Sequence, residues 1–148
     1  MSQKLTLQGQ VTPKVVIFKS ESHKLHQAFV VADGATIVKG MPVKLDTDGK
    51  ISAYAGTGVY LGIAVTDNVN PAYKAQRGFP VEVTVAVEGF AIINAAAGAA
   101  IEAAGFVKPT AEVLNGRYVK YTASSAETNF IALNGAEEAN ELIQVLVK

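Results

Sequence analysis

Two stretches of the chain alternate between apolar and more polar residues with a period of two. In the first stretch the large apolar residues are Val59, Leu61, Ile63 and Val65. In the second, after a polar stretch, they are Val81, Val83, Val85 and Val87. Successive side chains of a β-strand point to opposite faces of the sheet. The pattern therefore predicts two strands, each with one buried and one wetter face.

The alternation changes phase at Gly89, after which Phe90 and Ile92 are the next large apolar residues. A glycine at a phase change is typical of a β-bulge, which re-aims the side chains that follow it. We therefore expect Phe90 to point inward together with Val83 and Val85. This region contains no reactive side chain, so the sequence indicates a scaffold.

The rest of the chain consists of short apolar runs separated by turn signals at regular intervals, as in all-β sandwiches and barrels. Residues 46–49 end in Asp-Gly and predict a hairpin into Ile51, and Asn115-Gly116 predicts another turn. Both dipeptides tolerate the positive φ that tight turns need. Residues 142–147 predict a last strand. The expected fold is mainly β, a small β-barrel or β-sandwich.

The N-terminal residues differ from the remainder. Residues 1–27 hold four lysines against one glutamate and contain one short apolar run, residues 15–18. We interpret residues 1–27 as an extended N-terminal arm with one strand-like segment, followed by a single β domain over residues 28–148. A frayed terminus plus an edge strand is an equally good interpretation.

One segment is ambiguous between helix and strand. Residues 94–104 are rich in alanine, with Asn94 as a candidate N-cap and Gly105 just past the end. Gly98 would cost such a helix about 1 kcal/mol relative to alanine, and a helix this short must be packed to exist. We therefore expect at most one short helix.

Composition excludes several classes of function. The chain has 148 residues, of which 49% are apolar and 18% charged, as in globular proteins. Its 13 basic residues balance its 13 acidic ones, so no charge excess favours nucleic acid or an anionic membrane. The lack of cysteine excludes disulfides and sulfur-ligated metals. No apolar run is long enough to span a bilayer, and no secretory signal is recognisable, so we expect synthesis in a cytoplasm.

The candidate chemical sites are weak. His23 and His26, with Glu21, could hold a metal, but two solvated histidines are the favoured interpretation. The acidic turn at residues 46–49 lacks the further ligands of a calcium loop. Glu82 and Glu88 are six residues apart, about 20 Å along a strand, too far for a glycosidase pair. Phosphate-binding and nucleophile-elbow motifs are absent. We predict no catalytic residue, no cofactor and no metal, and therefore not an enzyme.

Four segments occur in an order that resembles a known family. They are Gly40-Met41-Pro42-Val43, Asp48-Gly49-Lys50-Ile51, the run from Leu61 to Asp67, and the run from Val81 to Phe90. In this order they resemble the capsid decoration (cement) proteins of tailed bacteriophages, in which a G-x-P-V strand, a G-I-A-x-T-D segment and a V-x-V-x-V-x-G strand recur. The resemblance covers roughly residues 30–90.

The resemblance implies a β domain that binds the outer surface of the mature capsid and stabilises it. The implied partner is the major capsid protein, the implied location is the virion, and lambda-type members form trimers whose N-terminal arm pairs with the shell. Strand addition to a sheet edge of the shell would use main-chain hydrogen bonds. The predicted capsid-contact residues are Lys14, Val15, Val16, Ile17, Phe18 and Lys19.

Two other interpretations stay open. The chain could be a β domain of a head fibre or tail appendage that binds a receptor or a glycan, or a small enzyme. Sugar sites usually need exposed aromatic side chains. The tyrosines of this chain are Tyr54, Tyr60, Tyr73, Tyr118 and Tyr121.

Overall fold

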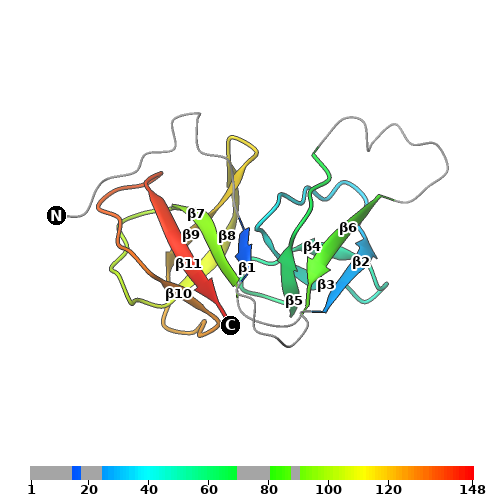
Figure 1. Ribbon diagram of the computed structural model, residues 1–148, viewed down its shortest axis with the longest axis horizontal. Coiled ribbons are helices and arrows are strands. Elements are labelled where there is room, and N and C mark those ends of the chain that lie inside the picture. Colours follow the sequence, from blue (N-terminus) through cyan, green and yellow to red (C-terminus); the bar gives the residue numbers. More distant parts are fainter. Residues whose placement is uncertain (1–14, 18–24, 70–80, 88–90) are drawn as a thin grey trace.

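The computed structural model describes residues 25–69, 81–87 and 91–148, together with the backbone of residues 15–17 (Figure 1). Eleven strands and no helix occur in these ranges. The strands are β1 (Val15–Ile17), β2 (His26–Val30), β3 (Pro42–Leu45), β4 (Ile51–Ala53), β5 (Val59–Ala64), β6 (Glu82–Ala86), β7 (Ala91–Ala97), β8 (Val107–Leu114), β9 (Tyr118–Ala123), β10 (Phe130–Ala132) and β11 (Leu142–Val147). The predicted mainly β fold is confirmed.

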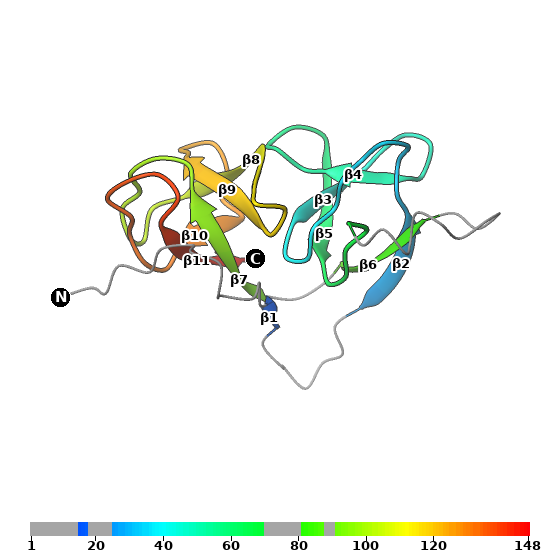
Figure 2. The same cartoon turned by 90° about the horizontal axis from the view of Figure 1, so that it is seen from above.

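The strands form two sheets that lie side by side as two lobes (Figures 1 and 2). One sheet has the order β10-β11-β7-β9-β8, with β1 also paired to β7, and the other has the order β2-β6-β5-β3-β4. Strands β7 and β9 are parallel and every other strand pair is antiparallel. The architecture is therefore two sheets, neither of them closed into a barrel.

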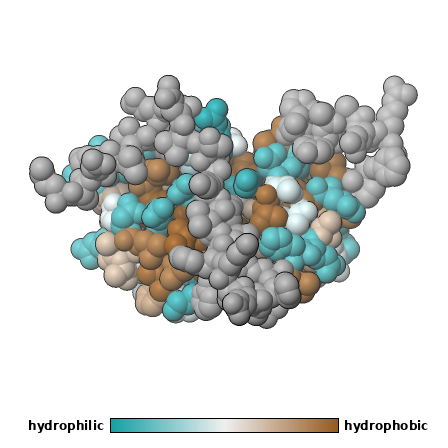
Figure 3. Space-filling view, viewed as in Figure 1, coloured by the Kyte–Doolittle hydropathy of each residue, from teal (hydrophilic) through white to brown (hydrophobic). Residues whose placement is uncertain are grey.

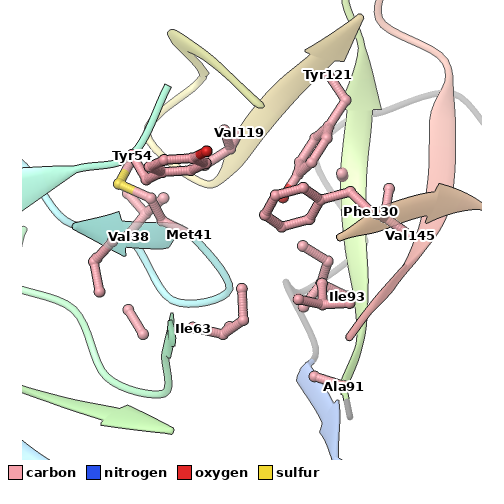
Figure 4. Packing of buried hydrophobic residues seen from close by; sticks show 14 of the residues in the cluster. Val38, Met41, Tyr54, Ile63, Ala91, Ile93, Val119, Tyr121, Phe130 and Val145 are labelled. Carbon is pink, nitrogen blue, oxygen red and sulfur yellow. The ribbon is translucent and has the colours of Figure 1, made fainter. Parts of the chain in front are cut away.

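One hydrophobic core joins the two sheets. Val38, Met41 and Ile63 reach it from one lobe, and Ile93 and Val145 from the other (Figure 4). Because the buried side chains of both lobes belong to one cluster, the described part of the chain packs as a single unit.

Strand β6 has the predicted alternation. Val83 and Val85 are 0% exposed, whereas Glu82, the first residue of β6, is exposed. Full burial of each valine contributes roughly 1.5–3 kcal/mol. The prediction that these two valines face the core is confirmed. Gly89 and Phe90, the predicted bulge and its inward phenylalanine, lie outside the described residues.

The predicted hairpins are present. Gly49 has a φ of 80°, and its N–H donates to the carbonyl of Asp46 at 3.0 Å between β3 and β4. Asn115 and Gly116 have φ of 53° and 67° between β8 and β9. Positive φ at both central residues is the geometry of a type I′ turn, whose twist matches that of the strands.

In the strand predicted at residues 59–65, the first residues face the opposite way from the prediction. Val59 is 66% exposed, and Tyr60, predicted on the wetter face, packs against the core. The cause is a bulge: Val43 pairs with Gly62 but Lys44 pairs with Tyr60, so Leu61 has no partner on β3. An extra residue reverses the alternation of the residues before it.

The alanine-rich segment begins as a strand and not as a helix. Residues up to Ala97 belong to β7, which pairs with β11 through six consecutive residues. Ala95 and Ala97 are buried in the main core. Sheet pairing on both sides of β7 outweighs the modest helix preference of alanine, so the helix that the sequence left open does not form.

Candidate interaction surface

Strand β1 contains three of the six predicted contact residues. Val15, Val16 and Ile17 form β1, while Lys14, Phe18 and Lys19 lie outside the described residues. Strand β1 runs antiparallel to β7, with the pairs Val15↔Ile93, Val16↔Ile92 and Ile17↔Ala91. The strand-like run of the arm is therefore added to a sheet of its own chain, a partner that the sequence did not reveal.

The position of β1 makes it an edge strand of the described structure. The same residues of β7 pair with β11 on the opposite side, through Ile93↔Val145, Ile92↔Leu146 and Ala91↔Val147. Within the described ranges β7 is the strand to which β1 pairs. An edge strand presents N–H and C=O groups that can pair with another chain. The predicted boundary between arm and domain, at residue 28, falls inside β2, which begins at His26.

Next to β1, the outer face of the six-stranded sheet carries a row of apolar side chains. The row follows directly from strand register: Ile92 lies opposite Leu146, Leu146 opposite Ile131, and Ile131 opposite Phe106. Residues opposite each other in neighbouring strands share a face. The neighbours of Ile131 and Leu146 along their strands, Phe130 and Val145, are fully buried and point to the core.

This row is partly open to solvent. Phe106 is 43% exposed, and Leu133, which follows β10 and donates its N–H to the carbonyl of Gln144 on β11, is 42% exposed. Ile92, Ile131 and Leu146 are of intermediate exposure. Figure 3 shows hydrophobic residues gathered on the surface of the lobe that contains β10 and β11. We call Ile92, Phe106, Ile131, Leu133 and Leu146 the outer apolar patch.

Strands β7, β10 and β11 contain no charged residue on either face. Their outward polar side chains are Asn94 and Gln144, which lie directly opposite each other. Other strands are different: β6 begins with exposed Glu82, and β8 and β9 of the same sheet are joined by the ion pair between Glu112 and Lys120 at 3.1 Å. Charged side chains on exposed sheet surfaces suppress association, so their absence from these three strands marks a surface suited to contact.

A cluster of aromatic rings joins the two lobes at the core. Tyr60 contacts Phe130 edge to face at a centroid distance of 5.5 Å, and Tyr121 contacts the same ring at 5.7 Å. Tyr54 and Tyr60 are 5.2 Å apart. Figure 4 shows Tyr121 beside Phe130 and Tyr54 across the core from them. Edge-to-face pairs stabilise by about 0.5–1.5 kcal/mol each beyond area burial, so this cluster fixes the two sheets to each other.

Glu127 completes this cluster and was missed by the sequence reasoning. Its carboxylate accepts hydrogen bonds from the Tyr54 hydroxyl at 2.7 Å and from the side-chain amide of Asn129 at 2.9 Å. Burial, and then the hydrogen bond to Glu127, raises the pKa of Tyr54 to about 12. Burial raises the pKa of Tyr121 as well. The tyrosines stay protonated at neutral pH, so the cluster acts as packing and hydrogen bonding. A glutamate in a polar loop carries no sequence signal for this role.

The structure describes one of the three residues of the candidate metal site. His26 is an exposed residue of β2, and His23 lies outside the described residues. Among the residues that the structure describes, no three His, Cys, Asp or Glu side chains are grouped so that they could hold a metal ion. The described ranges also contain no helix with the length and hydropathy needed to cross a bilayer. Glu82 is described and exposed, whereas Glu88 is not described.

Comparison with known proteins finds no protein-family model that matches this chain and no match among curated proteins.

Proposed function

We propose that this protein decorates the capsid of a tailed bacteriophage, binding the outer surface of the mature shell and stabilising it. The major capsid protein is the partner, the virion is the location, and the protein assembles on the shell as a trimer. The observation that carries the proposal is the placement of β1. The described part of the predicted contact run, residues 15–17, forms an edge strand on a larger sheet, where its free side can receive a strand of the shell.

The body behind β1 suits a protein that stabilises by binding. Two sheets share one core and are joined by the aromatic cluster and the Tyr54–Glu127 hydrogen bond. A ligand that binds only the mature lattice stabilises that state by mass action. A rigid ligand loses little conformational entropy on binding, so more of the contact energy appears as affinity.

The alternative, a fibre or tail domain that binds a glycan, has less support in the tyrosines. Tyr54, Tyr118 and Tyr121 are buried, and Tyr60 packs against the core. Tyr73 lies outside the described residues. A sugar stacks on an exposed ring, so the described tyrosines are poorly placed for it.

The proposal is tested with bare expanded heads and two proline variants. Alternate N–H groups of a strand point to opposite edges, so one of Val15→Pro and Val16→Pro removes an N–H directed at β7 and the other removes one directed at the free side. Proline is tolerated where the N–H faces away from the sheet. We expect one variant to fold with an unchanged melting temperature and to lose co-sedimentation with heads.

The second variant is the matched control, because it disturbs the pairing to β7 and should lower the melting temperature. If both variants bind heads as tightly as the unaltered protein, β1 is not the anchor. If the unaltered protein does not bind expanded heads at all, the proposed function is wrong.

A further inference from the structure

We propose that the outer apolar patch is the surface through which the copies in the proposed trimer contact one another. This deepens the self-association that is part of the proposed function. It concerns a different surface from β1, so the two can fail separately.

The patch is not part of the protein's own core. Among the described residues, neither the main hydrophobic cluster nor the residues packed against it include Ile92, Ile131 or Leu146. The far end of the same sheet face is covered, since Ala96, Tyr118 and Leu142 form a small cluster of their own with Leu114 packed on it. Within the part of the chain that the structure describes, no cluster accounts for the apolar side chains at the near end, and a contact with another copy supplies a reason for them.

The lack of charged residues around the patch favours a second copy over a charged partner. No charged residue occurs in β7, β10 or β11, so a strongly acidic or basic surface would find no complement there. The whole chain balances 13 basic against 13 acidic residues, so copies do not repel one another through net charge. An uncharged patch is best complemented by an uncharged patch, and each copy brings one.

The polar pair on this face also suits identical partners. Asn94 and Gln144 lie opposite each other beside the apolar row. A side-chain amide carries both donors and an acceptor, so equivalent amides brought together around an axis can bond to one another. Such a pair fixes the relative orientation of the copies, as a single buried asparagine does in coiled coils.

The size of the patch sets the strength of the contact. Three strand-to-strand steps from Phe106 to Ile92 span about 14 Å at the usual strand spacing. A standard interface buries about 800 Å² on each partner and has a dry centre within a polar rim. The patch fits such a centre and is too small for an obligate interface. We therefore expect reversible association that increases with concentration and is completed on the shell.

The test is sedimentation velocity from micromolar to millimolar concentration with a pair of matched lysine variants. Leu133→Lys places a charge on the patch at a side chain that is already 42% exposed, so the monomer should fold normally. Val59→Lys makes the same kind of change at a residue 66% exposed on the other lobe. We expect the unaltered protein and Val59→Lys to reach trimers, and Leu133→Lys to associate at least tenfold more weakly with an unchanged melting temperature.

Cysteine cross-linking gives a second measurement, because the chain contains no cysteine of its own. Gln144→Cys places a thiol on the proposed contact and Ser125→Cys places one at an exposed loop position. Under mild oxidation we expect covalent dimers to form from Gln144→Cys many times faster than from Ser125→Cys. Equal rates would overturn the proposal, as would a wild-type protein that stays monomeric throughout or a Leu133→Lys variant that associates normally.

The two proposals are separated by assaying the same variants on heads. Leu133→Lys that binds heads as isolated monomers leaves the decoration function standing and supports the patch as the contact between copies. Wild-type trimers that ignore heads would support the patch and overturn the decoration function.

Discussion

The Tyr54 hydroxyl donates a 2.7 Å hydrogen bond to the carboxylate of Glu127, which ties a residue next to β4 in one lobe to the loop between β9 and β10 in the other. The same carboxylate accepts hydrogen bonds from the backbone and side-chain N–H groups of Asn129. A single side chain thus links the two sheets and orders the loop that leads into β10. Its removal should affect the whole fold and not only the loop.

Glu127→Ala is expected to lower the free energy of unfolding by about 1–3 kcal/mol, because it leaves the Tyr54 hydroxyl without its acceptor. The measurement is urea denaturation at neutral pH. Glu112→Ala is the control: Glu112 is mostly exposed and pairs with Lys120 at 3.1 Å. Exposed ion pairs contribute at most about 1 kcal/mol and often less. Equal effects of the two substitutions would show that Glu127 does not join the lobes.

The tyrosines predict a loss of stability at alkaline pH. Burial, then the hydrogen bond to Glu127, raises the pKa of Tyr54 from 10.0 to about 12, and burial raises the pKa of Tyr60 and of Tyr121 in the same direction. Unfolded tyrosine ionises near pH 10. The stability that these protonated tyrosines contribute to the folded state is therefore fully present below pH 10 and is lost as the pH rises through their folded-state pKa.

We expect the free energy of unfolding to fall steadily as the pH rises from 10 to about 12, with tyrosinate absorbance appearing together with unfolding. Tyr54→Phe should reduce the steepness of that fall, since one of the titrating groups is gone. A stability that is flat across this range would contradict the assigned environment of the tyrosines.

Val85→Asp is expected to cost several kcal/mol, because Val85 is 0% exposed and an unpaired carboxylate would enter the shared core. Thermal denaturation measures the effect. Thr84→Asp is the neighbouring control, since Thr84 is only partly buried on the opposite face of β6. A melting temperature that falls equally for both substitutions would mean that β6 does not have one buried face.

Local features of the fold could be predicted from the sequence. The turns at Gly49 and Asn115 were found because positive φ restricts residue choice, and the last strand was found from its apolar run. The outcome for Val59 could not be predicted, because the bulge at Leu61 depends on which residues of β3 lie opposite. A one-residue change in register reverses every side chain beyond it.

The candidate interaction surface could likewise be predicted only in part from the sequence. The strand character of residues 15–17 was predicted from sequence, but their pairing to β7, roughly 75 residues later, was not. The outer apolar patch exists only once register places Phe106, Ile131, Leu146 and Ile92 in one row. Contacts between residues so distant in sequence carry no local signal, and the link between Tyr54 and Glu127 is another of this kind.

The close approach of β5 and β6 gives the last prediction. Gly62 lies in the Leu-Gly-Ile-Ala segment, and a Cβ atom added there would overlap the carbonyl oxygen of Ala86 and stand 2.9 Å from its carbonyl carbon. Backbone cannot move aside as a flexible side chain can, so the strands would have to separate where Ile63 and Ala64 pair with Ala86 and Val85. Overpacking of this kind costs typically 1–3 kcal/mol and occasionally more.

Gly34→Ala is the control for Gly62→Ala. Gly34 has a φ of 76° and a Cβ added there would have no atom within 4 Å, so this substitution should cost only about 1–2 kcal/mol of backbone strain. Gly62→Ala should therefore have the lower unfolding midpoint in urea, and a midpoint at or above that of Gly34→Ala would show that β5 and β6 are not held this closely.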